Sequence, residues 1–332
     1  MKAAVIGSGG WGTALALLLC RNGHDTVLWS HNPAKAEQMA QSRVNPMLAG
    51  VMLPETLKIS ADPACAADRD LVVIASPSFP IRGVCRSVAP FLKPDAIVVS
   101  VTKGIEPGTL LRMSQVVEQE TGKTVVALTG PSHAEEVGRG IPTGCLAACA
   151  DRRRAELVQD AFMSDTFRVY TSPDVIGAEL GGALKNVIAL CAGVSDGLGY
   201  GDNTKAMLMT RGLTEMARLG VAMGARKETF AGLAGVGDLI VTCTSVHSRN
   251  RRAGILIGQG HAPQDAMQEV GAVVEGYFAA RSAWELCHKQ GVEMPIVQAA
   301  HSVLYEQMDP GRAVRNLLLR QRRSESEDAG WL

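Results

Sequence analysis

A glycine-rich turn near the start of the chain constrains its fold more than any other feature. The run Lys2–Ile6 is typical of a strand, the next residues are Gly7-Ser8-Gly9-Gly10-Trp11-Gly12, and residues 13–20 are typical of a helix. In a G-x-G-x-x-G turn the first glycine makes a tight bend, the second lets backbone amides approach a pyrophosphate, and the third lets helix and strand pack closely. The helix dipole also favours an anion there. The pattern predicts a dinucleotide-binding βα unit with Gly7, Gly9 and Gly12 as cofactor residues, and a plain βα turn is the alternative.

Length and charge set broad limits on the fold and on the partners. The chain has 332 residues, 46% of them hydrophobic, and it exceeds the size at which a single hydrophobic core normally stops growing. The sequence therefore predicts two domains. Lys plus Arg and Asp plus Glu number 33 each, so the formal net charge is zero. A neutral chain has no global electrostatic attraction to nucleic acid or to an anionic membrane, and we expect neither as a partner.

The eight cysteines and the seven histidines argue against disulfides and against a metal site. The cysteines include no C-x-x-C pair and mostly lie in apolar runs, which is typical of small buried thiols in a reducing compartment. The histidines include no H-E-x-x-H motif, and no Cys/His group has the spacing of a zinc site. No stretch approaches about 18 apolar residues free of charge, and a cleavable signal would remove the glycine turn. We expect a cytoplasmic protein with no metal and no membrane insertion.

Two textures divide the chain. In the first half, short runs rich in Val, Ile and Ala alternate with helix-like stretches, which predicts crossover units and a parallel sheet whose carboxyl edge binds ligands. From residue 175 onward strand-like runs nearly vanish, and long segments of Ala, Leu, Gly and Met predict helices. We therefore predict an α/β fold with a dinucleotide-binding domain over residues 1–174, a helical substrate domain over residues 175–320 and a mobile tail over residues 321–332. The predicted strands lie at residues 3–6, 26–29, 71–75, 96–101, 125–129 and 145–148.

A lysine in an apolar segment is the leading candidate for acid–base chemistry. Residues 181–194 are nearly all apolar, and their only polar side chains, Lys185 and Asn186, are adjacent. A helix that is hydrophobic on all sides is buried, and burial lowers the pKa of a lysine toward neutrality. Lys185 is then suited to give or take a proton near working pH. The alternative is a lysine that reaches the surface or pairs with a structural acid.

A second polar cluster contains an acid, hydroxyl groups and arginines. Asp238 ends the glycine-rich run 235–238, and residues 242–252 read Thr-Cys-Thr-Ser-Val-His-Ser-Arg-Asn-Arg-Arg. Arginine binds phosphate through two parallel hydrogen bonds, and serine hydroxyls and asparagine amides add polar contacts. The cluster therefore indicates a small phosphorylated ligand. A solvated basic face is the alternative, and the lack of interleaved aromatic residues makes nucleic acid a poor third.

Two further residues bear on the ligands. Lys103 follows the strand-like run 96–101, which places its ammonium at the ligand edge of the sheet unless it is an ordinary surface lysine. His31 follows the run 26–29, where an NAD-specific fold usually offers a carboxylate to the ribose, but this chain has Ser30, His31 and Asn32 there. Without the acid a ribose phosphate is not repelled. We therefore expect NADP(H) or NAD(H) as cofactor with NADPH favoured, unless His31 only caps a turn.

Five segments, in order, resemble the signatures of the bacterial NAD(P)-dependent glycerol-3-phosphate dehydrogenases. With the glycine turn, the resemblance runs from residue 7 to about residue 295. It implies a Rossmann-type parallel sheet domain followed by an all-α domain like the C-terminal domain of 6-phosphogluconate dehydrogenase. It also implies reversible reduction of dihydroxyacetone phosphate to sn-glycerol 3-phosphate for glycerophospholipid synthesis. The segments are residues 100–106 (SVTKGIE), 128–134 (LTGPSHA), 179–187 (ELGGALKNV), 235–239 (GVGDL) and 247–250 (HSRN).

The same resemblance implies roles for individual residues. Lys185 is implied to be the catalytic residue, which accepts the proton in oxidation and donates it in reduction. A homodimer is compatible with the sequence. The implied substrate contacts are Lys103, Gly130, Ser132, Lys185, Asp238, Ser248, Arg249 and Asn250. The implied cofactor contacts are Gly10, Trp11, His31, Lys103, Ala134, Arg249, Val273 and Glu275.

Two other functions stay open on the residues alone. A different two-domain dehydrogenase, acting on a β-hydroxyacid or a sugar phosphate, would share the glycine turn and a lysine in the helical domain. Among the residues, only the segment Ser248-Arg249-Asn250 distinguishes it from a glycerol-3-phosphate dehydrogenase. A non-catalytic sensor would bind NADP(H) and report redox state to a partner, and the adjacent Lys185 and Asn186 in an apolar helix disfavour it.

Overall fold

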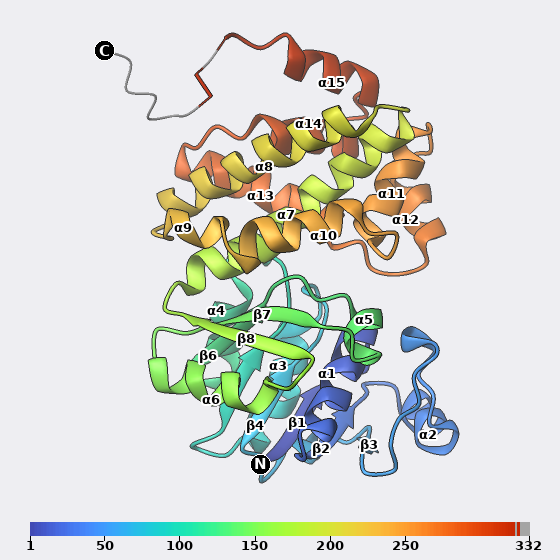
Figure 1. Ribbon diagram of the computed structural model, residues 1–332, viewed down its shortest axis with the longest axis vertical. Helices are drawn as coiled ribbons and strands as arrows, with labels where there is room; N and C mark the ends of the chain where they lie inside the picture. Colours follow the sequence, from blue (N-terminus) through green and yellow to red (C-terminus); the bar gives the residue numbers. More distant parts are fainter. Residues whose placement is uncertain (323, 326–332) are drawn as a thin grey trace.

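The computed structural model describes residues 1–322, 324 and 325. The first half of the chain forms a sheet flanked by helices, and the second half forms a layer of helices stacked on one end of that sheet (Figure 1). The prediction of a mobile tail over residues 321–332 falls largely on residues 323 and 326–332, which lie outside the described residues.

The sheet has eight strands in the order β3-β2-β1-β4-β5-β6-β7-β8. Its first six members have the strand order of a doubly wound dinucleotide-binding fold. All six predicted strands are present, and two more were missed because neither has a continuous apolar run: β3 has three residues, and β8 alternates buried and exposed side chains. The strands are β1 (Lys2–Ile6), β2 (Asp25–Trp29), β3 (Lys58–Ser60), β4 (Leu71–Ile74), β5 (Ile97–Ser100), β6 (Val125–Thr129), β7 (Thr143–Ala148) and β8 (Phe167–Ser172).

One pair of strands departs from the predicted parallel sheet. Strands β6 and β7 pair antiparallel, with Leu128 opposite Ala147, whereas the other six pairs are parallel. The link between them contains only the short helix α5 (Ala134–Gly138). Five helical residues span about 8 Å, which is too short to carry the chain back along the sheet for a parallel crossover. The sheet is therefore parallel except at this step.

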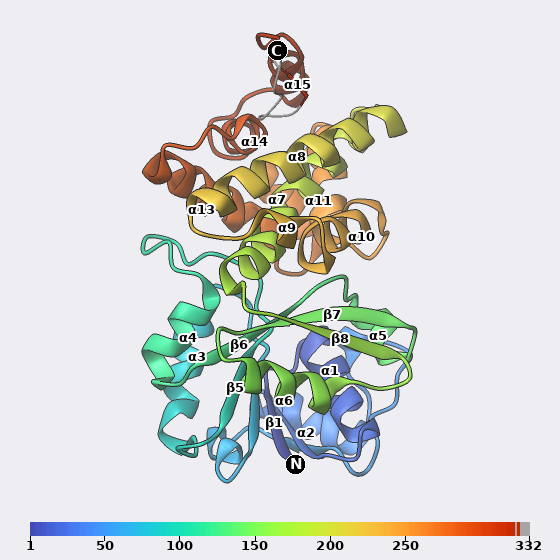
Figure 2. The same ribbon diagram turned by 60° about the vertical axis from the view of Figure 1, so that its left-hand side comes forward.

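Helices cover both faces of the sheet. Alternate residues of β1 enter different cores: Val5 packs with α1 (Gly10–Arg21) and α6 (Arg152–Phe162), while Ile6 packs with α3 (Ile81–Val88) and α4 (Met113–Thr121). This alternation is the period of a strand that is buried on both sides. Figure 2 shows α3 and α4 on one side of the sheet and α1 and α6 on the other. The remaining helical turns of this half are α2 (Pro33–Ser42), η1 (Pro46–Leu48), η2 (Pro63–Ala66) and η3 (Ala89–Phe91).

Helix α7 (Val175–Gly197) is the centre of the second half. Nearly all of its residues are buried, and it begins three residues after the last residue of β8. As the composition predicted, every regular element described after β8 is helical. These elements are α8 (Asp202–Ala222), α9 (Lys227–Phe230), the π-helical turn η4 (Leu233–Gly237), α10 (Asp238–Thr244), α11 (Arg249–Gly258), α12 (Pro263–Val270), α13 (Glu275–Gln290), α14 (Pro295–Tyr305) and α15 (Pro310–Leu318).

Small residues bring α7 and α11 into backbone contact. A Cβ at Gly193 would lie 2.1 Å from the carbonyl oxygen of Arg251, and a Cβ at Gly254 would lie 2.1 Å from that of Leu190. Any larger side chain would have to push the helices apart. The close approach fixes the amino end of α11, and with it Arg249, against the helix that carries Lys185.

The apolar sequence of α7 resembles that of a membrane-spanning helix, but the helix is buried inside the protein. It is long and apolar enough to cross a membrane, but 83% of its most apolar 18-residue window is buried inside the protein. A bent pair formed by residues 227–244 and α11 passes the same test only when the two are joined across a 52° bend. Burial of this extent is what the core helix of a globular domain has.

Candidate functional site

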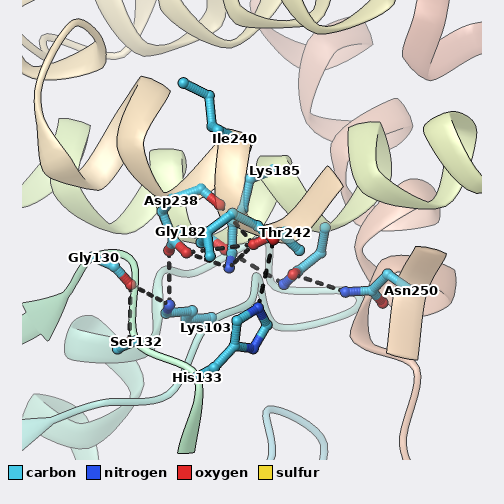
Figure 3. A network of polar contacts seen from close by, with 12 residues as sticks. Lys103, Gly130, Ser132, His133, Gly182, Lys185, Asp238, Ile240, Thr242 and Asn250 are labelled. Atoms are coloured by element: carbon cyan, nitrogen blue, oxygen red, sulfur yellow. Dashed lines mark hydrogen bonds and ion pairs between the residues drawn. The ribbon is translucent and has the colours of Figure 1, made fainter. Parts of the chain in front are cut away.

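Two lysines from different halves of the molecule bind the same carboxylate. Lys185, in the middle of α7, places Nζ 2.5 Å from Oδ1 of Asp238, the first residue of α10. Lys103, in the loop after β5, places Nζ 2.7 Å from Oδ2 of the same side chain. Figure 3 shows the three side chains pointing toward one another. Three predicted site residues that are far apart in the sequence therefore meet at one point.

A pair of glycines lets α7 reach this point. A Cβ at Gly181 would lie 2.2 Å from the carbonyl oxygen of Ala234, and a Cβ at Gly182 would lie 2.8 Å from Oγ1 of Thr129. The helix thus contacts both the turn before Asp238 and the end of β6. Because residues four apart share a helix face, the side chain of Lys185 lies on the same face as Gly181 and points into this junction.

Burial controls the protonation of the two central groups. Lys185 is 6% exposed, and burial lowers the pKa of its ammonium to about 8, while the Asp238 carboxylate opposes that shift and Lys103 adds to it. Burial raises the pKa of Asp238, but the Lys103 and Lys185 ammonium groups outweigh it, so the pKa of this carboxyl lies below its usual range. At neutral pH Asp238 is ionised, and Lys185 is poised near the pH at which it exchanges a proton.

Thr242 is a fourth member of this cluster, and the sequence alone did not single it out as a partner of Lys185. The Lys185 ammonium donates to Oγ1 of Thr242 at 2.6 Å, and this hydroxyl donates to the backbone carbonyl of Asp238 at 2.6 Å. The available signal was the spacing, since Asp238 and Thr242 are four residues apart on one helix and share a face. The helix α10 therefore presents two acceptors to one ammonium.

The carboxyl edge of the sheet supplies the other wall. Lys103 also donates to the carbonyl oxygen of Gly130 at 3.0 Å, and Oγ of Ser132 donates to that oxygen at 2.9 Å. Gly130 has a φ of +142°, and a Cβ there would lie 3.1 Å from Cα of Cys145. The position therefore requires glycine. The predicted substrate residues Gly130 and Ser132 thus adjoin Lys103.

The segment predicted to bind phosphate begins α11. Ser248 caps the helix, with Oγ accepting from the backbone N–H of Arg251 at 3.2 Å, and Arg249 is exposed at the first helical position. Asn250 is buried: its Nδ2 donates to Oδ1 of Asn186 at 2.9 Å, and its Oδ1 accepts from the backbone N–H of Gly276 at 2.8 Å. An exposed guanidinium at a helix N-terminus suits an anion.

The glycine turn has the geometry that its sequence predicts. Gly7 has a φ of +129°, and a Cβ at Gly12 would lie 2.0 Å from the carbonyl oxygen of Gly7. Nothing lies within 4 Å of the Cβ position of Gly9, which caps α1. The turn therefore combines a tight bend and close packing with an open face at a helix N-terminus. These residues fit the pyrophosphate of a dinucleotide.

Two more observations support a cofactor at this face. The indole Nε1 of Trp11 is buried and has no hydrogen-bond partner among the described residues. A buried unpaired donor costs about 1–3 kcal/mol unless a ligand satisfies it. A Cβ at Gly10 would lie 2.6 Å from the carbonyl oxygen of Met47 and 3.5 Å from Cβ of Ala134. The predicted cofactor residues Gly10 and Ala134 therefore lie side by side.

The end of β2 presents no acidic side chain to the turn. His31 is exposed, Oγ of Ser8 donates to Oγ of Ser30 at 2.9 Å, and Asn32 caps α2. Lys35 reaches back from α2, and its Nζ donates to the carbonyl oxygen of Ser8 at 3.1 Å. A cation thus lies against the glycine turn, and no carboxylate follows β2, where an NAD-specific fold has one.

The last two predicted cofactor residues lie at the start of α13. Val273 is exposed, and Glu275 is the first residue of the helix. Both carboxylate oxygens of Glu275 accept from Ser78 in the loop after β4: Oγ donates to Oε2 at 2.6 Å and the backbone N–H donates to Oε1 at 3.1 Å. Burial raises the pKa of Glu275. The helical half is therefore hydrogen-bonded to the sheet edge at this position.

The site holds a histidine but no metal-ligand cluster. Among the residues that the structure describes, no group of three or more His, Cys, Asp or Glu side chains could hold a metal ion. His133 follows Ser132, and its Nε2 lies 3.5 Å from the carbonyl oxygen of Val241. Burial and then the Lys185 ammonium lower the pKa of His133. A neutral imidazole therefore borders the lysine pair at neutral pH.

Comparisons with known proteins cover nearly the whole chain. The family model described as the NAD-dependent glycerol-3-phosphate dehydrogenase N-terminus matches residues 2–155, and the model of the C-terminus matches residues 174–315. The chain is 49% identical over 330 residues to a glycerol-3-phosphate dehydrogenase (NAD(P)+) of Fusobacterium nucleatum, covering 98% of both chains. It is 49% identical over 333 residues to the protein of that name in Bacillus subtilis, covering 98% of this chain and 96% of the relative.

Solved structures agree with these relatives. The structure of a glycerol-3-phosphate dehydrogenase from Coxiella burnetii is 38% identical and superposes with a TM-score of 0.92, covering 96% of this chain and 99% of that one. A ketopantoate reductase from Ralstonia eutropha has a TM-score of 0.62 at 18% identity, covers 95% of this chain and 100% of that one, and shares the fold alone.

Proposed function

Because this chain belongs to the NAD-dependent glycerol-3-phosphate dehydrogenase family, we propose that Lys185 exchanges the proton in the family's reaction. The chain reversibly reduces dihydroxyacetone phosphate to sn-glycerol 3-phosphate with NAD(P)H. One observation carries the assignment of Lys185: its buried Nζ bonds to both Asp238 and Thr242, and its pKa is lowered to about 8. Such a group can donate and accept a proton at working pH.

The hydrogen bonds of Lys185 prepare it for this transfer. When bound, the reduced nicotinamide cofactor supplies the hydride. An ammonium has three N–H donors, and Asp238 and Thr242 accept two of them, so the third is left for the substrate oxygen. In reduction Nζ gives that proton as negative charge develops on the oxygen, and in oxidation the neutral amine takes the proton back. Asp238 stabilises the charged form of Lys185 and fixes its direction.

The remaining substrate contacts follow from placement. Lys103 has two of its N–H donors on Asp238 and Gly130, and we assign the third to the substrate. We assign the phosphate to Arg249, which is exposed at the N-terminus of α11. The proposed substrate residues are Lys103, Gly130, Ser132, Lys185, Asp238, Ser248, Arg249 and Asn250.

The cofactor is NAD(H) or NADP(H), and we propose that NADPH is favoured. The absence of an acid after β2 and the position of Lys35 beside the glycine turn support this preference, because a 2′-phosphate would meet a cation and no carboxylate. The proposed cofactor residues are Gly7, Gly9, Gly10, Trp11, Gly12, His31, Lys103, Ala134, Arg249, Val273 and Glu275.

We propose further that the enzyme works in the cytoplasm, that it forms a homodimer and that its product supplies glycerophospholipid synthesis. All eight cysteines are free, five of them buried and three partly buried, as expected in a reducing compartment. Leu318 and Leu319 at the end of α15 expose most of their apolar surface, which supports an association face.

The test is an assay of NADPH oxidation by the purified protein with and without dihydroxyacetone phosphate, repeated with NADH. We expect turnover that depends on the phosphate, so unphosphorylated dihydroxyacetone and a β-hydroxyacid substrate pair serve as negative controls. Lys185→Ala should lower kcat by at least about 100-fold with little change in KM. Lys289→Ala, an exposed lysine at the end of α13, should retain full activity. Wild-type turnover in Lys185→Ala would refute the proton-transfer assignment.

A further inference from the structure

Asp238 is not the only link between Lys103 and Lys185. A second set of hydrogen bonds connects α7, which carries Lys185, to the start of α13. Asn186, the neighbour of Lys185, accepts from Nδ2 of Asn250 at 2.9 Å, and Oδ1 of Asn250 accepts from the backbone N–H of Gly276 at 2.8 Å. Gly276 follows Glu275 directly at the start of α13. A continuous path of bonds therefore runs from the helix of Lys185 to the Glu275 carboxylate.

The path continues across to the sheet. Glu275 accepts from both the hydroxyl and the backbone N–H of Ser78, at 2.6 and 3.1 Å. A Cβ at Gly104 would lie 2.6 Å from Cβ of Ser78 and 3.8 Å from Oε2 of Glu275. The loop that carries Lys103 thus rests on the pair formed by Ser78 and Glu275. The contacts form a closed ring that includes both lysines: Asp238 joins them directly, and the pair formed by Ser78 and Glu275 belongs to the longer connection between them.

We propose that Glu275 is a positioning residue, which holds the Lys103 loop at a fixed distance from Lys185 by accepting two hydrogen bonds from Ser78. This inference rests on the proposed function, because it concerns how the two proposed substrate lysines are aligned. It assigns Glu275 a task beyond contact with the cofactor, since both of its carboxylate oxygens already accept hydrogen bonds from the protein.

The chemistry of the residue fits the task. An ionised carboxylate has only acceptors, so it can bind an N–H and an O–H of one residue at once. Glu275 lies in the first turn of α13, where the helix dipole favours a negative charge. The Arg249 guanidinium also stabilises the charged form of Glu275, against the effect of burial. The hydrogen bonds from Ser78 and the charge of Arg249 thus oppose the rise in pKa that burial causes, although burial has the larger effect.

The alignment matters because Lys103 and Lys185 would hold the same small substrate. Reacting groups must stay in a narrow range of distances, and a shift of about 1 Å can cost about 100-fold in rate. Without Glu275 the Lys103 loop would keep its bond to Asp238 and the bond from the hydroxyl of Ser282 in α13 to the carbonyl oxygen of Ile105, but it would lose the hydrogen-bonded pair on which Gly104 packs. We expect the loss to affect kcat more than the binding of the cofactor to the glycine turn.

A double-mutant cycle tests the proposal. The variants are Glu275→Ala, Ser78→Ala and the double variant, with Ser76→Ala as control. The hydroxyl of Ser76 lies in the same loop, and its one bond among the residues that the structure describes goes to the carbonyl of Pro77. The measurements are kcat and KM for dihydroxyacetone phosphate, and the Kd of NADPH by fluorescence without substrate. We expect each single variant to lower kcat about fivefold to tenfold, and the double variant to lose no more than the worse single one. Ser76→Ala should match the wild type, and Glu275→Gln, which keeps one acceptor oxygen and the volume, should recover part of the loss.

Three results would overturn the proposal. They are additive losses of kcat in the double variant, a Kd for NADPH that rises while kcat stays constant in Glu275→Ala, and an unchanged Ser78→Ala. The melting temperature of each variant shows whether it is folded, and Glu275→Gln replaces Glu275→Ala in the cycle if the latter does not fold. Retained turnover in Lys185→Ala would instead defeat the proposed function, and the coupling between Ser78 and Glu275 in kcat could still be measured in that case.

Discussion

The Nζ of Lys185 lies 2.5 Å from Oδ1 of Asp238, and both side chains are almost fully buried. A buried ion pair adds little net stability when it is intact, because desolvation of the two charges offsets their attraction. Removing one member is costly, because the other is left as an unpaired charge. The pair is therefore better explained by its part in proton transfer than by its contribution to folding. The first substitution to test is at its carboxylate, Asp238.

We expect Asp238→Asn to lower both activity and stability. The amide keeps the shape of the carboxylate but leaves the Lys103 and Lys185 ammonium groups without their shared counter-ion. kcat should fall about 100-fold or more, and the free energy of unfolding should fall by about 3 kcal/mol. Steady-state kinetics and urea denaturation measure the two effects. Asp265→Asn, an exposed acid on α12, is the matched control, and a fully active Asp238→Asn would contradict the role given to the carboxylate.

The pH dependence of the reaction should differ in sign between its two directions. Burial lowers the pKa of Lys185 to about 8, so the ammonium form needed for reduction is present below that pH and is lost as the pH rises through it. The amine form needed for oxidation appears above that pH. Profiles of kcat/KM from about pH 6 to about pH 10 should therefore fall on the alkaline side for reduction and on the acid side for oxidation.

The same profiles offer an internal check on the cause of the shift. In Asp238→Asn the carboxylate no longer raises the pKa of Lys185, so the alkaline limb for reduction should move to lower pH. A limb that stays in place in this variant would mean that a group other than Lys185 sets the profile. His133 is not that group, because its pKa is lowered from its ordinary value and lies below the limb.

Arg249 should govern substrate affinity more than turnover. Its guanidinium is exposed at the start of α11, and a charge-assisted bond to a phosphate contributes about 1.5–3 kcal/mol. Arg249→Ala should therefore raise KM for dihydroxyacetone phosphate by about 10-fold to 100-fold. Arg252→Ala removes the same charge from an exposed position of the same helix and should change KM little. Equal effects of the two variants would point to a general electrostatic attraction instead of a phosphate contact.

Much of the fold was predictable because its elements have simple local signatures. Apolar runs indicated six strands, and the glycine turn indicated the first βα unit together with its three glycine roles. The strands β3 and β8 lack such runs, and the reversal at β7 depends on the length of α5, which no periodicity indicates. These features are decided by packing against the rest of the sheet.

The site also has a part that was predictable from the sequence and a part that was not. Lys185, Asp238 and Lys103 were predictable because each is a charged residue in an apolar or glycine-rich setting, or at the end of a strand. Their mutual contacts were not, since the bonds join residues 53 and 135 positions apart. The bond between Ser78 and Glu275 spans 197 positions and connects a loop to the first residue of α13 without any shared pattern. Sequence reasoning therefore found the reacting groups but not the contacts that align them.

The close approach of α7 and α11 leads to a prediction about stability. A Cβ at Gly193 would lie 2.1 Å from the carbonyl oxygen of Arg251, which is backbone and cannot move aside alone. Gly193→Ala should therefore push α11 away and lower the free energy of unfolding by about 1–3 kcal/mol, although alanine is the better helix former. Gly83→Ala is the matched control, because it lies within α3 and a Cβ there meets nothing within 4 Å. The control should raise stability by about 0.5–1 kcal/mol. Because α11 carries Arg249, a shifted α11 should also raise KM for dihydroxyacetone phosphate in Gly193→Ala. If the melting temperature and KM of Gly193→Ala both equal those of the wild type, the two helices do not need this contact.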